Sequence, residues 1–264
     1  MRASFLRVLV LLLLVLPLFA TAQEPLQAQA QPYRELDAAA VEAYRKQDLG
    51  TARQYWERCL EDPQLQASRA EKGRILYDLG NVAYRDKQLL EAVGWYTAAL
   101  RERPRDSDTW SNLEQARSDA HLEPADRGDL VSSLERLVSS LTLEESRALA
   151  LYAGLVWALF LAGEAFFGGR TWAWLARIST LGMLACLVPW VVQGARAGAN
   201  ELLVIAPQPL ELRSEPRADA ARILELAPGA RVVYQDELPD WIKVDDGSAH
   251  SGWAPRAALF PLAR

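Results

Sequence analysis

Histidine and cysteine are scarce in this chain, whose 264 residues hold two of each. His121 and His250 lie in different parts of the chain, and neither has the cysteine or glutamate neighbours that metal-ligand spacing requires. Cys59 falls in a helical segment, whereas Cys186 falls inside a long apolar run, so the two cannot form a disulfide bond. These absences argue against a metal site and against a disulfide framework.

Catalytic motifs are missing as well. The sequence holds no Ser-His-Asp set, no glycine-rich phosphate loop and no paired-carboxylate motif, and two isolated histidines leave little acid–base chemistry. We therefore expect no catalytic residues and no cofactor, which disfavours an enzyme. A long basic run is also missing and the net charge is −5, which argues against nucleic acid as a partner.

The dominant feature of the sequence is a pair of long apolar runs within residues 148–195. The first spans about residues 148–167 and the second about residues 172–192. Each has about the 20 residues that a helix needs to cross roughly 30 Å of hydrocarbon. The alternative, a pair of buried helices in a soluble bundle, is disfavoured because such helices seldom stay apolar on all sides over this length. The runs predict a two-helix transmembrane hairpin.

The turn between the runs is short and basic. It consists of Gly168, Gly169 and Arg170, and Arg177 lies near the beginning of the second run. By the positive-inside rule this end of the hairpin is cytoplasmic, which places the chain before and after the hairpin on the outer side of the membrane.

The N-terminus has the pattern of a secretory signal peptide over residues 1–22. Two arginines precede an apolar stretch from Val8 to Phe19, and the small-x-small sequence Ala20-Thr21-Ala22 precedes Gln23. A cleaved signal and a retained anchor both place the following residues outside the cytoplasm. Residues 23–34 are rich in glutamine, alanine and proline, which predicts a flexible spacer.

Residues 35–122 are expected to form a tetratricopeptide repeat domain. The central repeat has small, aromatic and proline residues at the spacing of that 34-residue motif: Leu79, Gly80, Ala92, Tyr96, Ala99 and Pro104. Trp110 and Leu113 repeat two of these positions 34 residues after Leu76 and Leu79. An earlier repeat has its first helix at Glu35–Arg45 and about six extra residues within 64–71. We expect two repeats and a closing helix.

Such arrays bind peptides along the face formed by the first helix of each repeat. In the central repeat that face predicts a peptide-binding groove made of Arg74, Tyr77, Asn81, Tyr84 and Arg85, with Tyr44 and Arg45 before it and Gln115 after it. An asparagine and an arginine one turn apart have the donors to hold a peptide backbone or a terminal carboxylate. The alternative for each residue is an ordinary solvated helix face.

Residues 126–146 predict an amphipathic helix, with Leu130, Leu134 and Leu137 at helical spacing. Two interpretations stay open: the helix caps the repeat array, or it lies in the membrane surface before the first crossing. Thr142 and Glu145 form a capping-box pattern, which predicts that a new helix begins there and continues into the membrane.

Residues 200–264 change to short alternating patterns separated by Pro-Gly and Asp-Gly turns, which predicts a small all-β barrel. The expected strands are Leu202–Ile205, Leu210–Arg213, Arg222–Leu226, Arg231–Gln235, Trp241–Val244 and Gly252–Ala254.

The strand and turn residues of this part carry a more specific resemblance. They are the Leu210–Pro216 strand, the Pro228-Gly229 turn, the Trp241-Ile-Lys-Val244 strand and the final Gly252-Trp253-Ala254. They resemble the bacterial SH3-like domain of cell-envelope proteins, with Ala254 in place of the usual valine. That resemblance implies an interaction module, in some members a binder of cell-wall peptides.

The same resemblance makes Tyr234, Trp241 and Trp253 candidates for an exposed aromatic groove. The alternative is that these aromatic side chains fill the barrel core and rim.

The whole order of segments resembles the BatE proteins of the Bat (Bacteroides aerotolerance) operons. This resemblance implies a non-enzymatic inner-membrane adaptor or scaffold with both outer modules in the periplasm. It also implies von Willebrand factor A domain membrane proteins and a MoxR-type ATPase system as partners. The second hypothesis is a peptidoglycan-binding protein that acts through the SH3-like domain.

Overall fold

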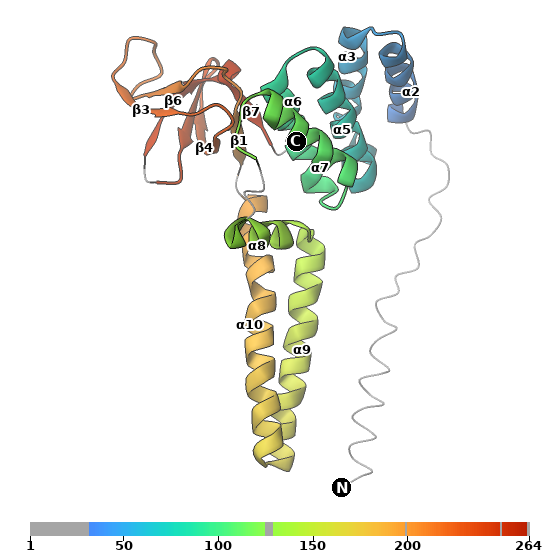
Figure 1. Ribbon diagram of the computed structural model, residues 1–264, viewed down its shortest axis with the longest axis vertical. Coiled ribbons are helices and arrows are strands. Elements are labelled where there is room, and N and C mark those ends of the chain that lie inside the picture. The colour runs from blue at the N-terminus through green and yellow to red at the C-terminus, as the bar shows by residue number, and fades with distance from the viewer. Residues whose placement is uncertain (1–31, 125–128, 199, 249, 263–264) are drawn as a thin grey trace. The chain divides into compact units, whose positions relative to one another are not determined.

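The computed structural model describes residues 32–124, 129–198, 200–248 and 250–262 (Figure 1). The predicted signal peptide, residues 1–22, and most of the predicted spacer lie outside the described residues. Within the described part, nine α-helices precede a seven-stranded antiparallel sheet.

The first part is an array of antiparallel helices. Its members are α2 (Pro32–Arg45), α3 (Leu49–Cys59), α4 (Pro63–Gln66), α5 (Arg69–Arg85), α6 (Leu89–Glu102) and α7 (Ser107–Asp119). Gly80 of α5 lies directly against the Tyr96 ring of α6, because a Cβ at Gly80 would come within 2.5 Å of that ring. The close contact between α5 and α6 therefore requires a small residue at position 80, as the sequence spacing predicts.

Two boundaries differ from the sequence-based expectation. Helix α2 begins at Pro32, three residues before the expected Glu35, because Tyr33 is buried in the core and its carbonyl accepts a hydrogen bond from Cys59 Sγ at 3.4 Å. Residues 32–34 therefore belong to a helix and not to the spacer. The extra residues after Pro63 form the short helix α4, which contributes the fully buried Leu65.

The same left-handed turn ends three helices of the array. Gln47, Lys87 and His121 have φ angles of 64°, 62° and 57°, each two residues after the last residue of α2, α5 or α7. The turn therefore recurs after 40 and then 34 residues. These are the intervals at which the sequence pattern repeats.

The second part consists of α8 (Leu130–Ser139), α9 (Leu143–Phe167) and α10 (Arg170–Gly198). Of the expected helix over residues 126–146, residues 126–128 lie outside the described residues, and the described part is broken after Ser139. Thr142 accepts a hydrogen bond from the Glu145 amide and Glu145 accepts one from the Thr142 amide, so the predicted capping box starts α9. Helices α9 and α10 are both long and apolar enough to cross a membrane, by length and composition.

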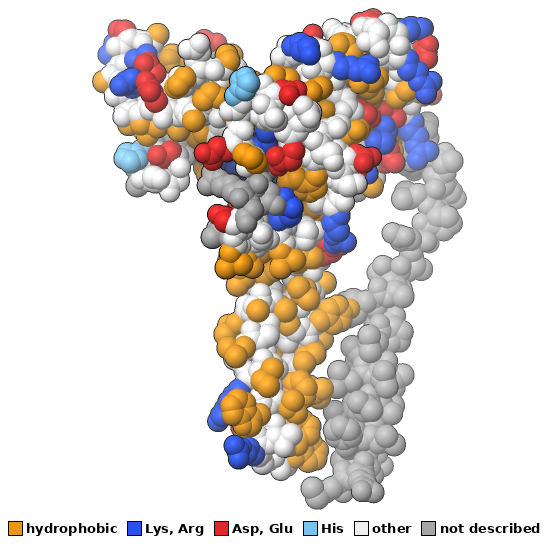
Figure 2. All heavy atoms as spheres, viewed as in Figure 1, with side chains coloured by type: hydrophobic (Ala, Val, Ile, Leu, Met, Phe, Trp, Pro, Cys, Tyr) orange, Lys and Arg blue, Asp and Glu red, His pale blue; other side chains and the backbone are white. Residues whose placement is uncertain are grey.

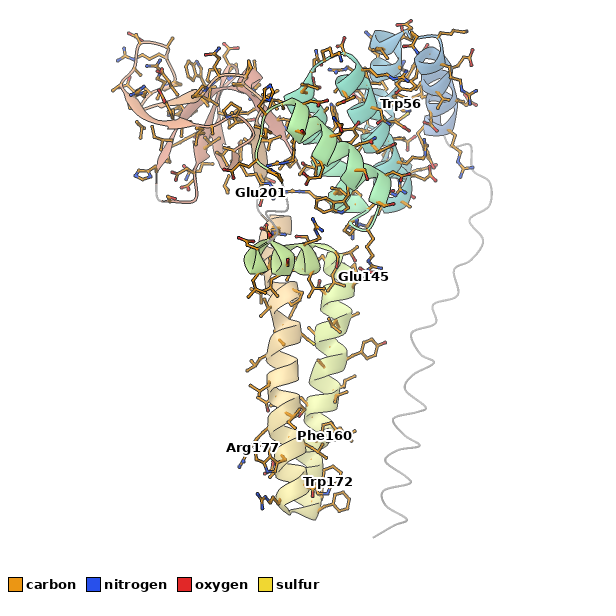
Figure 3. All side chains as sticks on the ribbon, in the orientation of Figure 1. Trp56, Glu145, Phe160, Trp172, Arg177 and Glu201 are labelled. Atoms are coloured by element: carbon orange, nitrogen blue, oxygen red, sulfur yellow. The ribbon has the colours of Figure 1, made fainter. Side chains whose placement is uncertain are left out.

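The far end of this hairpin is closed by aromatic packing (Figure 3). The Trp172 ring fills the space that a Cβ at Gly163 would occupy, and it also packs against Phe160 with 6.4 Å between ring centroids. Arg177 lies 5.8 Å from the Trp174 ring centroid. The two-residue link uses Gly168 and Gly169, whose φ angles of 60° and 91° favour glycine.

The third part is a seven-stranded sheet of order β3-β2-β6-β5-β4-β1-β7. Its strands are β1 (Glu201–Val204), β2 (Leu210–Arg213), β3 (Arg222–Leu226), β4 (Arg231–Glu237), β5 (Trp241–Asp245), β6 (Ser251–Pro255) and β7 (Leu259–Pro261). The six expected strands are present, with ends within two residues of prediction. The seventh, β7, was not expected because it has only three residues.

Strand β7 and its neighbour β1 also complete the core of the helices. Phe260, Leu262 and Leu203 belong to the same buried cluster as the array, and Phe260 meets Trp95 of α6 edge-on with 4.8 Å between ring centroids. A Cβ at Gly94 would come within 2.6 Å of the Phe260 ring. A separate cluster of buried aliphatic residues lies within the sheet itself.

Candidate functional site

One side of the helical array carries a connected set of polar side chains from α2, α5 and α7. Helix α5 buries Ile75, Leu76, Leu79, Val82 and Ala83 in the core, so the other side of the helix lies outside the core. We call this side the polar face and define it by Asp37, Tyr44, Arg74, Tyr77, Asp78, Asn81, Tyr84, Arg85, Asn112 and Asp119. All five predicted groove residues lie on it.

Arg74 is surrounded by carboxylates at one end of the polar face. Its guanidinium donates to both oxygens of Asp37 on α2, at 2.6 and 3.2 Å, and to Asp78 at 3.2 Å and Glu71 at 3.3 Å on its own helix. Asp37 also accepts a hydrogen bond of 2.8 Å from the Trp56 indole. Because three carboxylates already use its donors, Arg74 holds helices together and is poorly suited to binding another anion.

Asp78 is the most perturbed carboxyl group of the polar face. Its pKa is raised from the ordinary value of 3.8 to about 6: burial is the largest cause and the nearby charge of Asp37 adds to it, while Arg74 and Arg103 oppose the rise. The net negative charge around Arg74 therefore changes in mildly acidic conditions.

Asn81 is the centre of a second hydrogen-bond group. Its Oδ1 accepts from the Tyr96 hydroxyl at 2.8 Å and from Asn112 Nδ2 at 3.1 Å. Asn112 Nδ2 also lies 3.1 Å from the Tyr77 hydroxyl. Helices α5, α6 and α7 are thereby joined, and among the described residues Asn81 Nδ2 itself has no hydrogen-bond partner and keeps two donors.

Tyr84 and Arg85 occupy the other end of the polar face. The Tyr84 hydroxyl donates to Asp119 Oδ2 of α7 at 2.6 Å. Arg85 is exposed and lies 4.4 Å from the centroid of the Tyr44 ring. Within the described ranges Arg85 has no carboxylate partner, in contrast to Arg74, so its guanidinium is open to an acceptor from outside.

Sequence reasoning missed four members of the polar face: Asp37, Asp78, Asn112 and Asp119. Asp78 follows Arg74 by four residues, a spacing that signals an ion pair on a helix. The other three lie on α2 and α7, and only the packing of these helices against α5 shows that they face it.

The predicted aromatic groove of the sheet is not a single cluster. Tyr234 pairs with Val244 and packs against the sheet core. Trp241 and Trp253 lie on adjacent strands, where Trp253 is opposite Lys243, and both are half-buried on the other face. Because residues directly opposite in an antiparallel pair point to the same side, Tyr234 is separated from the two tryptophans.

A cavity of about 640 Å³ lies away from the polar face, among residues of α6, α7, α8, α10 and β4. Six arginines from different elements line it, among them Arg101, Arg196 and Arg231. Burial lowers the pKa of Arg101; Glu201, its ion-pair partner, opposes this, while Arg231 and Arg196 add to it. The cavity therefore favours anions over cations.

Neither histidine belongs to the polar face or lines the cavity. His121 occupies a left-handed turn, and His250 lies in an exposed turn with Nδ1 3.3 Å from Asp246 Oδ2. In the part of the chain that the structure describes, no three His, Cys, Asp or Glu side chains are grouped to hold a metal ion.

No protein-family model matches the chain, and no curated protein matches it.

Proposed function

We propose that this protein is a non-enzymatic adaptor, anchored in a bacterial inner membrane by α9 and α10. In this proposal α2–α7 are a tetratricopeptide repeat array and the sheet is an SH3-like module, both in the periplasm, as in BatE-like proteins. The support is the recurrence of one turn after 40 and 34 residues, together with two helices of membrane-spanning length.

The observation that carries the proposal is the pair of unused donors on the polar face. Asn81 Nδ2 and the Arg85 guanidinium are four residues apart on α5, so they are neighbours on one side of the helix. Both are held in place by contacts to other helices, Asn81 through Tyr96 and Arg85 through Tyr44. Preorganised donors of this kind suit the carbonyls or terminal carboxylate of a peptide.

The partners that this proposal favours are proteins of the cell envelope. The resemblance to BatE proteins points to von Willebrand factor A domain membrane proteins, associated with a MoxR-type ATPase system. Such partners would supply the segment that lies along α2, α5 and α7.

The test is crosslinking in intact membranes, followed by affinity capture of the tagged full chain and mass spectrometry. Arg85→Glu removes a charge-assisted hydrogen bond and adds repulsion toward a carboxylate, which is worth roughly 1.5–3 kcal/mol. We expect capture of the partner to weaken by about one to two powers of ten.

Arg58→Glu is the matched control, because Arg58 is an exposed cation on α3, outside the three helices of the polar face. It should leave capture unchanged. Equal capture by the wild type and Arg85→Glu, at equal membrane levels, would refute the role of the polar face.

A second candidate function is peptidoglycan binding through the sheet. It is favoured by the half-buried Trp241 and Trp253 with Lys243 between them on one face. The full chain in detergent should then sediment with purified cell wall, and Trp253→Ala should reduce the bound fraction while Leu238→Ala, an exposed apolar control, should not. No sedimentation of the wild type would exclude this function.

A further inference from the structure

Helix α8 exposes an unbroken row of leucines. Leu130, Leu134 and Leu137 are spaced by four and three residues, so they form one stripe, and their side chains are 75%, 53% and 64% exposed. A short helix with three large apolar side chains open on one side needs an apolar surface to cover them.

The polar side of α8 is turned toward the rest of the protein. Glu135 and Ser139 lie on it, and the guanidinium of Arg196 donates to Glu135 Oε1 at 2.9 Å and to Ser139 Oγ at 2.7 Å. Ser132, Glu135, Arg136 and Ser139 also line the cavity described above. The leucine stripe therefore points away from the helical array and does not serve as its cap.

Hydrogen bonds fix α8 at the end of the hairpin. Gln193 Nε2 of α10 donates to the carbonyls of Val138 and Leu141, at 2.9 and 2.7 Å, and satisfies groups that the end of α8 leaves open. Helix α9 begins at Leu143, four residues after the end of α8. Figure 1 shows α8 lying across the end of α9 and α10.

The exposed apolar surface continues from α8 onto the hairpin. Figure 2 shows hydrophobic side chains from the level of α8 along the length of the two helices. Exposed members include Leu151 and Leu155 of α9 and Val188 and Val191 of α10. The stripe on α8 is thus the outer end of a surface that has the composition to face lipid.

We propose that α8 lies in the headgroup–acyl boundary of the membrane that α9 and α10 cross, with Leu130, Leu134 and Leu137 in the lipid. This rests on the membrane anchoring in the proposed function. Helix α9 is about 37 Å long at 1.5 Å per residue, enough to cross roughly 30 Å of hydrocarbon and reach the boundary where α8 lies. The arginine and glutamate of its polar side stay in the aqueous layer.

Spin labels on the full chain in lipid nanodiscs test this placement. The background is Cys186→Ala, with the fully buried Cys59 retained and shown not to label. Single cysteines replace Leu134 on the stripe, Leu155 as the reference for the bilayer interior and Gln54 on α3 as the reference for water. The rate at which each spin label collides with a reagent is measured for oxygen, which concentrates in lipid, and for a nickel chelate, which stays in water.

We expect the oxygen-to-nickel ratio at Leu134→Cys to be severalfold above that at Gln54→Cys and below that at Leu155→Cys. Ser133→Cys, one residue away and off the stripe, should give a lower ratio than Leu134→Cys. A ratio at Leu134→Cys equal to that at Gln54→Cys would place the stripe in water and overturn the proposal.

Low collision with both reagents at Leu134→Cys would show that protein covers the stripe, from this chain or a second copy, and would also overturn the proposal. If Leu155→Cys collided freely with the nickel chelate, the membrane anchoring itself would fail. The placement of α8 and the anchoring of the adaptor are therefore tested separately.

Discussion

Neutralising Asp78 on the polar face should remove a pH dependence from helix α5. Asp78 lies near Arg74, Asp37 and Arg103, and its pKa is raised to about 6, chiefly by burial. The folded state therefore binds a proton at this carboxyl more tightly than the unfolded state does, where the ordinary value is 3.8. As the pH falls through 6, protonation stabilises the fold, and the gain levels off near pH 4.

The magnitude follows from the two pKa values. Linkage gives about 1.4 kcal/mol more stability at pH 5 than at pH 7 from this carboxyl alone. The Asp78 side chain is 23% exposed, so screening by solvent reduces the expected effect to about 1 kcal/mol. In hydrogen exchange this is about a fivefold change in the protection of the α5 amides.

The assay compares the full chain and Asp78→Asn in nanodiscs at pH 5 and pH 7. Protection of α5 peptides is corrected for the intrinsic effect of pH on exchange. Arg74, Asp37 and Arg103 are present in both proteins, so the difference between the two proteins isolates the contribution of Asp78. We expect acid to raise protection about fivefold more in the wild type. An equal change in both proteins, or a loss of protection in the wild type alone, would contradict the reasoning.

Three further substitutions test packing and backbone geometry. Gly163→Val should destabilise the hairpin by roughly 1–3 kcal/mol, seen as a lower melting temperature in detergent, whereas Gly154→Ala has open space around it and should not. Phe260→Ala should cost about 3–5 kcal/mol and speed hydrogen exchange in β1 and β7. Lys87→Gly should stabilise the array by up to about 1 kcal/mol in thermal unfolding, because Lys87 has a φ of 62°, whereas Asp86→Gly should destabilise it.

Features set by short-range patterns were predictable from the sequence. The hairpin follows from two apolar runs, the start of α9 from the Thr142–Glu145 capping box and six strands from local alternation. The five groove residues also fall on one side of α5 as expected, because the helical period decides that placement without reference to any other element.

Features that depend on partners distant in sequence were not predictable. Arg74 was expected to bind a peptide, but Asp37, 37 residues earlier, already holds it. The resemblance to SH3-like domains grouped Tyr234 with the two tryptophans, but the structure places Tyr234 on the other side of the sheet. The register of β4 shifts between Tyr234 and Asp236, and a pattern of period two cannot show which face a residue takes after such a shift.

The burial of α6 explains why the helical array and the sheet share a core. Every residue from Ala92 to Leu100 is buried, whereas a helix at the edge of an array leaves one side open to water. Phe260 and Leu203 supply the missing cover, and the Phe260 ring lies so close to Gly94 that a Cβ there would come within 2.6 Å of it. A chain ending after α10 would expose this side of α6, so the sheet stabilises the array in addition to any partner that it binds.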